Sequence, residues 1–354
     1  MATEKRVRDS FLEQARYCEK LGSTFMRDLL VGLARHLEPN TETGNRVLNW
    51  SGAPEPKSDA LALRLAGGIH GLARSGADKK LSHFYQNPQK SSEASFIPRV
   101  LAAIETHDAY LYPWLDMAPQ TNEVARASAI FSGLSVVAEE FRLPLALYEM
   151  GCSGGLNLQC AQFGYCFNGA AFGDASSKLQ LEPSWTGGLP PNIEFGVVSR
   201  QGCDLNPLFA TQELDAAKLV SYLWPDQPAR ITRVEAAINI AKSDPPELEK
   251  ADASDWVERK LMPGEGRGMV RVLYDTIAWN YFPALTKKRI TSHMNAVGAE
   301  ATRQNPLAWL TLEFDDEDNG PFLKLRTWPG NGEEQILASA DPHVHQLNWI
   351  GRSN

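Results

Sequence analysis

The sequence predicts an α/β protein in which a Rossmann-like, doubly wound and mostly parallel sheet with an antiparallel C-terminal hairpin is preceded by an all-α N-terminal domain. Hydrophobic residues recur at three- and four-residue steps up to about residue 142. Beyond that point short apolar runs alternate with helical segments, which is typical of a parallel sheet covered by helices. We therefore predict a helical domain over 1–142 and a sheet domain over 143–354, with an insertion at 164–191.

The helical half begins with one long predicted helix that ends before Pro39. Its buried face is predicted to hold Val7, Phe11, Ala15, Cys18, Phe25, Leu29 and Leu33. Further helices are predicted from Ser58 or Asp59 to about Arg74, over Pro98–Thr106, and after Thr121.

The second half contains a series of strand and helix signals. Strands are predicted at Leu145–Glu149, Asn192–Val198, Leu248–Ala251, Gly268–Tyr274, Leu307–Phe314, Phe322–Thr327 and Gln335–Ala340, and helices at Gly155–Phe163, Gln212–Leu223, Ala229–Lys242 and Leu285–Thr302. The last two strands read as a hairpin because turn residues separate them. The insertion is rich in Gly, Pro and Ser, with a possible short strand at Lys178–Leu181.

Composition excludes several classes of protein. The net charge of −8 argues against general nucleic-acid binding, which needs a basic face. The sequence contains no run of 18 apolar residues, the signal that predicts a transmembrane helix, so we expect no membrane partner. Five cysteines without a CxxC pair indicate neither a disulfide framework nor a zinc site, which favours a cytoplasmic location.

Acidic residues follow several predicted strands, and glycines follow the first. Glu149, Asp252 and Asp275 lie at or just beyond a strand end, and Asp204 lies in the loop after Val198. In a doubly wound sheet, ligands bind outside the carboxyl ends of the strands, so these side chains are candidates for a shared site. Carboxylates suit a ligand that offers hydroxyls and amines rather than phosphates.

The turn "EMGCSGG" resembles the first motif of class I S-adenosylmethionine-dependent methyltransferases. Glu149, Gly151 and Gly155 match that motif, and Ser153 stands where the family often has its middle glycine. The resemblance implies a methyltransferase-like fold and S-adenosylmethionine as the cofactor. Glu149 and Asp204 are 55 positions apart, more than is usual for this type of unit, which the insertion explains.

Two further segments extend the resemblance. "GCDLNP" is similar to the end of the family's second strand, which implies that Asp204 holds the ribose hydroxyls. "ADASDW" is similar to the third motif, which implies that Asp252 reads the adenine amine.

The segment "YDTIAWNYF" is the candidate catalytic stretch. Asp275 could act as a base, and Asn280 and Tyr281 could orient an acceptor. Trp279 could face the sulfonium cation, since aromatic rings attract positive charge. The asparagine–proline–proline–aromatic signature of nucleic-acid amino-methylating enzymes is missing, which favours a small-molecule or protein acceptor.

Over most of its length the chain also resembles an uncharacterised bacterial family catalogued as domain of unknown function 2332. The resembling stretches are "EMGCSGGLNL", "GCDLNPL", "WPDQPAR" and "VLYDTIAWNYF". This resemblance supports the fold more than a reaction.

Ordinary structural roles compete with each assignment. The glycine turn could serve close packing, Asp204 could cap its own turn, and Asp252 could cap a helix. His343 and His345 form an H-x-H pair without an evident third ligand, so no metal is predicted. Cys152 has no histidine near it in sequence to activate it.

Two other functions stay open. One is a non-catalytic ligand-binding or interaction protein on the same fold, with the helical half forming a possible homodimer. The other is an NAD-type oxidoreductase, which is disfavoured because the GxGxxG fingerprint fails at Ser153 and Leu156.

Overall fold

The computed structural model describes residues 4–88, 93–315 and 320–352. The chain forms two compact units, which we call the helical unit (Met1–Thr121 with Glu213–Thr232) and the sheet unit (Asn122–Gln212 with Arg233–Asn354). The division differs from the predicted boundary at residue 142, because helix α8 (Ala127–Phe141) packs on the sheet. A Cβ at Gly133 of this helix would lie 2.5 Å from Leu310 Cδ1.

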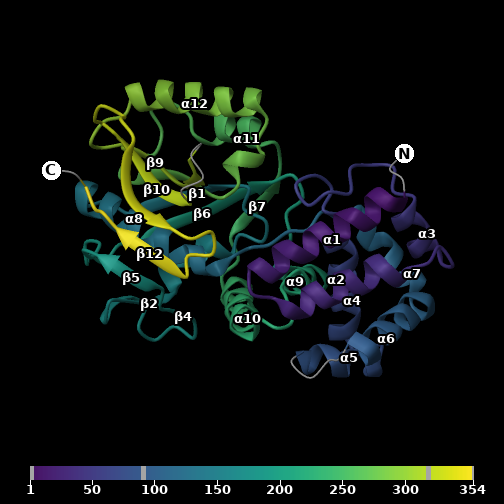
Figure 1. Cartoon of the computed structure of the whole chain (residues 1–354). Helices are drawn as coiled ribbons and strands as arrows, with labels where there is room; N and C mark the ends of the chain where they lie inside the picture. The colour runs from purple at the N-terminus through teal and green to yellow at the C-terminus, as the bar shows by residue number, and fades with distance from the viewer. Residues whose placement is uncertain (1–3, 89–92, 316–319, 353–354) are drawn as a thin grey trace. The chain divides into compact units, whose positions relative to one another are not determined.

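The helical unit consists, in its described residues, of helices and the turns between them (Figure 1). They are α1 (Glu4–Lys20), α2 (Thr24–His36), α3 (Glu42–Leu48), α4 (Leu61–Ser75), α5 (Lys79–Gln86), α6 (Glu93–Thr106), α7 (Asp108–Leu111), the 3-10 helix η2 (Tyr112–Asp116), α9 (Glu213–Ser221) and the start of α10 (Pro228–Ser243). The single long helix predicted at the start is wrong. Gly22 adopts φ +87°, and Ser23 caps α2 by accepting a hydrogen bond from the Met26 N–H.

The segment 213–232 is tied to the helical unit by specific contacts. Asp226 accepts hydrogen bonds from Ser23 Oγ (2.6 Å) and from the Phe25 N–H (3.1 Å) at the start of α2. Gly67 of α4 leaves room for the Tyr222 ring, which a Cβ would approach to 2.6 Å. Asp226 therefore caps a helix distant in sequence.

The sheet unit is built on nine strands in the order β5-β12-β11-β10-β9-β8-β1-β6-β7. Their bounds are β1 (Leu145–Met150), β5 (Ser184–Gly187), β6 (Val197–Asp204), β7 (Glu247–Lys250), β8 (Val270–Thr276), β9 (Leu307–Phe314), β10 (Pro321–Trp328), β11 (Gln335–Ala340) and β12 (Gln346–Trp349). Strands β7-β6-β1-β8-β9 are parallel, and β9, β10, β11 and β12 are successively antiparallel. The predicted α/β class, mostly parallel sheet and C-terminal hairpin are confirmed at this level.

Helices cover both faces of this sheet (Figure 1). Helices α11 (Ala253–Lys260) and α12 (Ala284–Ala299) contribute Trp256, Ile290 and Met294 to a core on one face. We call this the α12 face, and the opposite one, against which α8 packs, the α8 face. Because strand side chains alternate, neighbouring residues of one strand lie on different faces.

The insertion and two strand positions differ from expectation. Residues 164–191 contain β2 (Gly164–Phe167), β3 (Ala170–Gly173), β4 (Gln180–Leu181) and β5, of which β5 joins the large sheet beside β12. Strand β6 begins at Val197, later than the predicted Asn192, and it ends at Asp204, which the pattern placed in a loop and the resemblance placed at a strand end. Strand β8 ends at Thr276, two residues later than predicted, and so includes Asp275. The predicted helix after β1 is a 3-10 helix, η4 (Leu156–Gln162).

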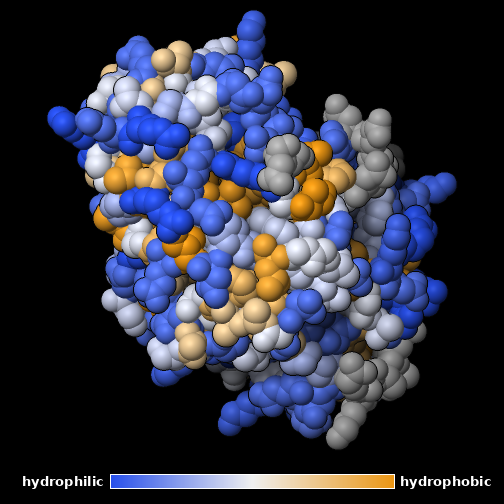
Figure 2. Space-filling model, turned by 90° about the vertical axis from the view of Figure 1, so that its left-hand side faces the viewer, coloured by the Kyte–Doolittle hydropathy of each residue, from blue (hydrophilic) through white to orange (hydrophobic). Residues whose placement is uncertain are grey.

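The surface is mostly hydrophilic on the face that Figure 2 shows, where hydrophobic residues form separate patches. Large exposed hydrophobic side chains of the sheet unit include Val198, Tyr281 and Leu285. No helix among the described residues combines the length and apolar character needed to cross a bilayer. The possible homodimer stays a prediction.

Candidate functional site

The direction of winding in the sheet reverses between β1 and β8. Strands β6 and β7 follow β1 on one side, whereas β8 and β9 lie on its other side. Sheets of this kind bind ligands outside the carboxyl ends of the strands at such a reversal. The residues that follow β1, β6, β7 and β8 therefore define the candidate site.

The turn after β1 has an unusual backbone. Gly151, Ser153 and Gly155 all have positive φ, at 62°, 50° and 63°. A Cβ on Gly151 would lie 2.6 Å from Ala278 Cβ, so the turns after β1 and β8 are in contact. A Cβ on Gly155 would lie 2.7 Å from Leu248 Cδ2, which makes close packing one reason for this glycine.

The turn after β8 is also strained. Ile277 has φ +52°, a conformation that is rare for a β-branched residue. Two non-glycine residues, Ser153 and Ile277, are thus left-handed on the two sides of the reversal. Such conformations cluster at functional sites, although Ala60, Arg142, Asn168 and Val344 also have positive φ elsewhere in the chain.

Asp204 is the last residue of β6, and its side chain contacts the turn after β1. Its carboxylate accepts hydrogen bonds from the Ser153 N–H (2.9 Å) and from the Asn206 N–H (2.8 Å). The structure therefore brings together two of the predicted cofactor-binding residues, and it also gives Asp204 the ordinary role of a turn cap.

Asp252 follows β7 and caps α11. It accepts hydrogen bonds from the N–H groups of Ser254 (2.8 Å) and Asp255 (3.3 Å). Partial burial opposes ionisation of Asp252, but these hydrogen bonds outweigh it and hold its pKa below the ordinary value. The predicted contact with an adenine amine stays a prediction.

Glu149 is buried on the α8 face, with 1% of its surface exposed. Tyr274 Oη donates to Glu149 Oε2 at 3.3 Å, and the two residues are register partners in β1 and β8. Burial raises the pKa of Glu149 to about 8, although the Tyr274 hydrogen bond acts in the opposite direction. The carboxyl group is therefore mostly protonated at neutral pH.

Asp275 lies on the α12 face, because it follows Tyr274 in β8. Glu149 and Asp275 thus point to opposite faces of the sheet rather than into one cluster. Asp275 is fully buried, and neither of its carboxyl oxygens has a hydrogen-bond partner in the described part of the chain. Burial and the negative charge of Glu313 raise its pKa well above the ordinary range.

Glu313 on β9 is a neighbour of Asp275 that the sequence analysis missed. Its Oε1 accepts hydrogen bonds from the N–H groups of Ala278 (2.5 Å) and Trp279 (2.8 Å), so it holds the turn after β8. Burial raises the pKa of Glu313 as well. The one available signal was a charged residue, Glu313, in the largely apolar strand "LAWLTLEF".

Arg126 and Asn157 were also missed. Arg126 donates to the carbonyls of Thr276 and Pro342 at 3.0 Å, and its positive charge partly opposes the rise in pKa that burial causes at Glu149 and Glu313. Asn157 in η4 is fully buried, and its side-chain amide has no partner among the described residues. Nothing in their local sequence distinguishes these two residues.

The predicted catalytic stretch continues as the 3-10 helix η5 (Trp279–Tyr281). Trp279 is half-buried and meets Trp309 edge to face, with 5.4 Å between the ring centroids. Asn280 is exposed, and Tyr281 has 81% of its surface exposed. Their predicted roles toward an acceptor stay predictions.

The histidine pair and Cys152 show ordinary surroundings. His343 Nδ1 lies 3.3 Å from Glu123 Oε2, and the His343 and His345 rings stack on each other. Over residues 4–88, 93–315 and 320–352 there is no group of three side chains suited to a metal ion. Cys152 is buried, which raises its pKa well above the usual range and keeps it a thiol.

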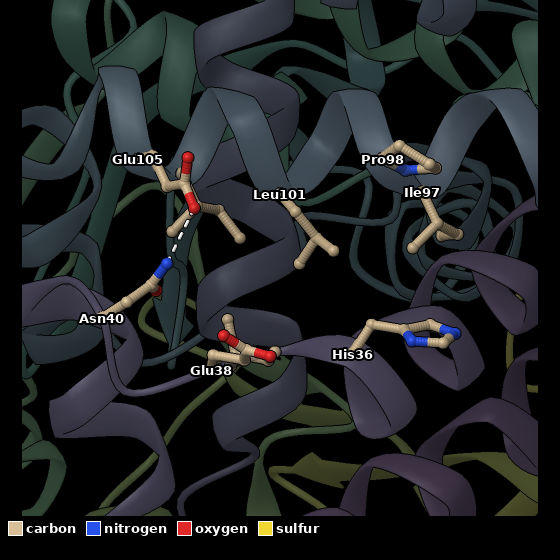
Figure 3. Close-up of a pocket in the computed structure, with 9 residues that line it drawn as sticks. His36, Glu38, Asn40, Ile97, Pro98, Leu101 and Glu105 are labelled. Atoms are coloured by element: carbon tan, nitrogen blue, oxygen red, sulfur yellow. Dashed lines mark hydrogen bonds between the residues drawn. The ribbon is translucent and has the colours of Figure 1, made fainter.

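The helical unit has a separate hollow of about 690 Å³ between the end of α2 and α6. Figure 3 shows Ile97, Leu101 and Glu105 on α6 above His36 and Glu38, with Asn40 donating to Glu105 at 2.7 Å. Its lining is largely apolar. The side chains that the sequence predicted as a site do not line it.

Comparison with known proteins places the chain in a family. The model described as "Uncharacterized protein conserved in bacteria (DUF2332)" matches residues 8–349, so the chain belongs to this family. No curated protein and no solved structure matches the chain. The family description names no activity.

Proposed function

We propose that the sheet unit binds S-adenosylmethionine across the carboxyl ends of β1, β6 and β7 and transfers its methyl group to a small molecule or a protein. The observation that carries this proposal is the parallel order β7-β6-β1-β8-β9, in which Asp204 of the second strand meets Ser153 of the turn after the first. This arrangement supports a class I methyltransferase-like fold.

The residues present suit the cofactor. Asp204 is half-buried at the end of β6 and would accept hydrogen bonds from ribose hydroxyls, and Asp252 would accept one from the adenine amine. Gly151 and Gly155 leave the turn without side chains at positive φ. When bound, the cofactor supplies an electrophilic methyl group on a positively charged sulfur, which the Trp279 ring would attract.

The same turn argues against a dinucleotide. A pyrophosphate binds to unoccupied backbone N–H groups at the start of an α-helix. Here the Ser153 N–H is bonded to Asp204, the Leu156 N–H to Asn122 Oδ1 at 2.8 Å, and the following helix is a seven-residue 3-10 helix. A carboxylate at this point also repels phosphate.

A second candidate, binding without catalysis, is favoured by the state of Asp275. A general base must be within reach of the proton that it removes and must itself be ionised. Asp275 is fully enclosed, and burial raises its pKa well above the ordinary range. In the catalytic form of the proposal, the acceptor therefore loses its proton to a group other than Asp275.

Thermal unfolding with S-adenosylmethionine, S-adenosylhomocysteine and NAD tests the proposal. A ligand at a hundred times its dissociation constant stabilises the native state by about 2.7 kcal/mol. The two adenosyl compounds are expected to raise the melting temperature, and NAD is not. No shift with either adenosyl compound, or an equal shift with NAD, would contradict the proposal.

Asp204→Asn localises the site, since it keeps the side-chain size and removes the charge. The variant should weaken adenosyl binding by about tenfold or more, measured by titration calorimetry. Asp174→Asn is the matched control, because Asp174 makes a similar turn contact with the Ser176 N–H (2.8 Å) in the insertion. Binding without methylation of any offered acceptor would select the second candidate.

A further inference from the structure

A hollow of the sheet unit lies on the α12 face and shares only Trp279 with the residues assigned to the adenosyl cofactor. Its volume is about 320 Å³, which is at the lower end of the range for small-molecule pockets. It is bounded by β9, β10, α12 and the turn after β8, and its walls include Trp279, Trp309, Glu313, Lys287, Lys324 and Arg326.

Strand alternation brings these side chains to one face. Trp309, Thr311 and Glu313 are successive same-face residues of β9, and Lys324 and Arg326 are their counterparts on β10. Lys324 is the register partner of Thr311, and Arg326 is that of Trp309. The hollow therefore has an Arg326 end and a Glu313 end, with Trp279 and Trp309 as aromatic wall.

Arg326 is held in a fixed orientation. Its Nε donates to the Gly332 carbonyl (2.6 Å) and its Nη2 to Asn295 Oδ1 (2.7 Å). Its guanidinium lies over the rings of Trp309 (5.5 Å) and Trp328 (4.9 Å). Nη1 has no hydrogen-bond partner among the described residues. A guanidinium oriented in this way is suited to a carboxylate.

Positive groups predominate among the charges without a partner. Lys287 of α12 is half-buried and makes no ion pair or hydrogen bond within the described chain. Lys324 Nζ forms an ion pair with Glu334 Oε1 at 3.1 Å and lies 3.9 Å from Asp315 Oδ2. Glu313, 5% exposed, has a raised pKa from burial, and its Oε2 has no partner in the described part of the chain.

We propose that this hollow binds a small aromatic carboxylic acid. Arg326 and Lys287 hold the carboxylate, and the ring lies against the two tryptophans. This assignment uses none of the residues assigned to the adenosyl cofactor except Trp279, so it can be tested without that cofactor.

Titration calorimetry with 4-hydroxybenzoate and its neutral analogue 4-hydroxybenzamide tests the proposal. We expect 4-hydroxybenzoate to bind with a Kd of about 1 mM or tighter, and the amide to bind about tenfold more weakly or not at all. Equal binding of the two compounds, or no binding of 4-hydroxybenzoate, would overturn the proposal.

Two variants tie the binding to the hollow. Arg326→Gln and Lys287→Gln should each weaken 4-hydroxybenzoate binding by about tenfold, and the second does so without disturbing the core, because Lys287 has no structural partner. Lys288→Gln is the matched control, since this neighbour is exposed and does not line the hollow. Unchanged affinity in Lys287→Gln, or an equal loss in Lys288→Gln, contradicts the assignment.

Discussion

Glu149 and Asp275 differ from Asp204 and Asp252 in what surrounds their carboxyl groups, although all four come from the same end of one sheet. The first two are buried between the sheet and its helices, and burial raises the pKa of each. The other two are partly exposed and accept hydrogen bonds from backbone N–H groups. The comparison separates buried, core-like acids from partly exposed, turn-capping acids.

The difference follows from where each residue lies in the ladder of strands. Glu149 and Asp275 still have register partners in β8 and β9, so their side chains project onto the sheet faces. Asp204 is the last residue of β6, and Asp252 lies beyond β7. Asp204 still pairs with Lys250 of β7, but at the strand end its carboxylate reaches the backbone N–H groups of the turns that follow β1 and β6.

The largest expected effect comes from Glu149→Gln. The unfolded chain ionises Glu149 near its ordinary pKa of 4.5, but the folded protein keeps the proton until about pH 8. The free energy of unfolding of the natural protein therefore falls as pH rises between these values, by up to about 5 kcal/mol from this group. Gln cannot ionise and can still accept from Tyr274, so the variant should lose this part of the slope.

Urea unfolding at several pH values, followed by tryptophan fluorescence, measures this slope. Glu247→Gln is the control, because Glu247 is exposed on the edge strand β7 and should leave the slope unchanged. If the difference in free energy of unfolding between the natural protein and Glu149→Gln stays constant from about pH 5 to about pH 8, Glu149 is not held protonated.

The sequence was sufficient for the order of secondary structure but not for its fine placement. The apolar run Leu145–Glu149 and the C-terminal strands are found where periodicity predicts them. Strand β6 was misplaced because its centre, Ser199–Gln201, is polar and reads as loop. That shift moved Asp204 from an expected loop to the end of a strand.

The site could be predicted only in part, for a similar reason. Strand-end position identifies Glu149 and Asp275 as neighbours, but their opposite faces depend on the register of β1 with β8, which a single sequence does not fix. Glu313 and Arg126 come from distant elements that meet at this edge only after folding. The ordinary capping role of Asp252 was predictable from the residues that follow it.

Asp204→Ala is expected to have the next largest effect on stability. It leaves the N–H groups of Ser153 and Asn206 without their carboxylate acceptor, at a cost of about 1–2 kcal/mol. Asp204→Asn keeps one side-chain oxygen and should lose less. Chemical denaturation measures both, and Asp174→Ala controls for loss of an exposed turn cap. If Asp204→Ala loses no more stability than Asp174→Ala, the Asp204 contact with the turn after β1 is an ordinary exposed turn cap.

Asp252→Ala should have the smallest effect, about 1 kcal/mol, since it removes one N-cap from the short helix α11. Asp252→Ser retains an oxygen acceptor and should stay within a few tenths of a kcal/mol of the natural protein. The pKa of Asp252 is lowered, so its contribution is present above the ordinary pKa of 3.8 and disappears as pH falls through the lowered value. The loss of stability in Asp252→Ala, measured by urea unfolding, should therefore become smaller in acid. Glu149→Gln should behave in the opposite way, because this variant should become more stable relative to the natural protein as pH rises. If Asp252→Ser is as unstable as Asp252→Ala, the carboxylate does more than cap α11, and Asp252 must make a stabilising contact beyond the helix end.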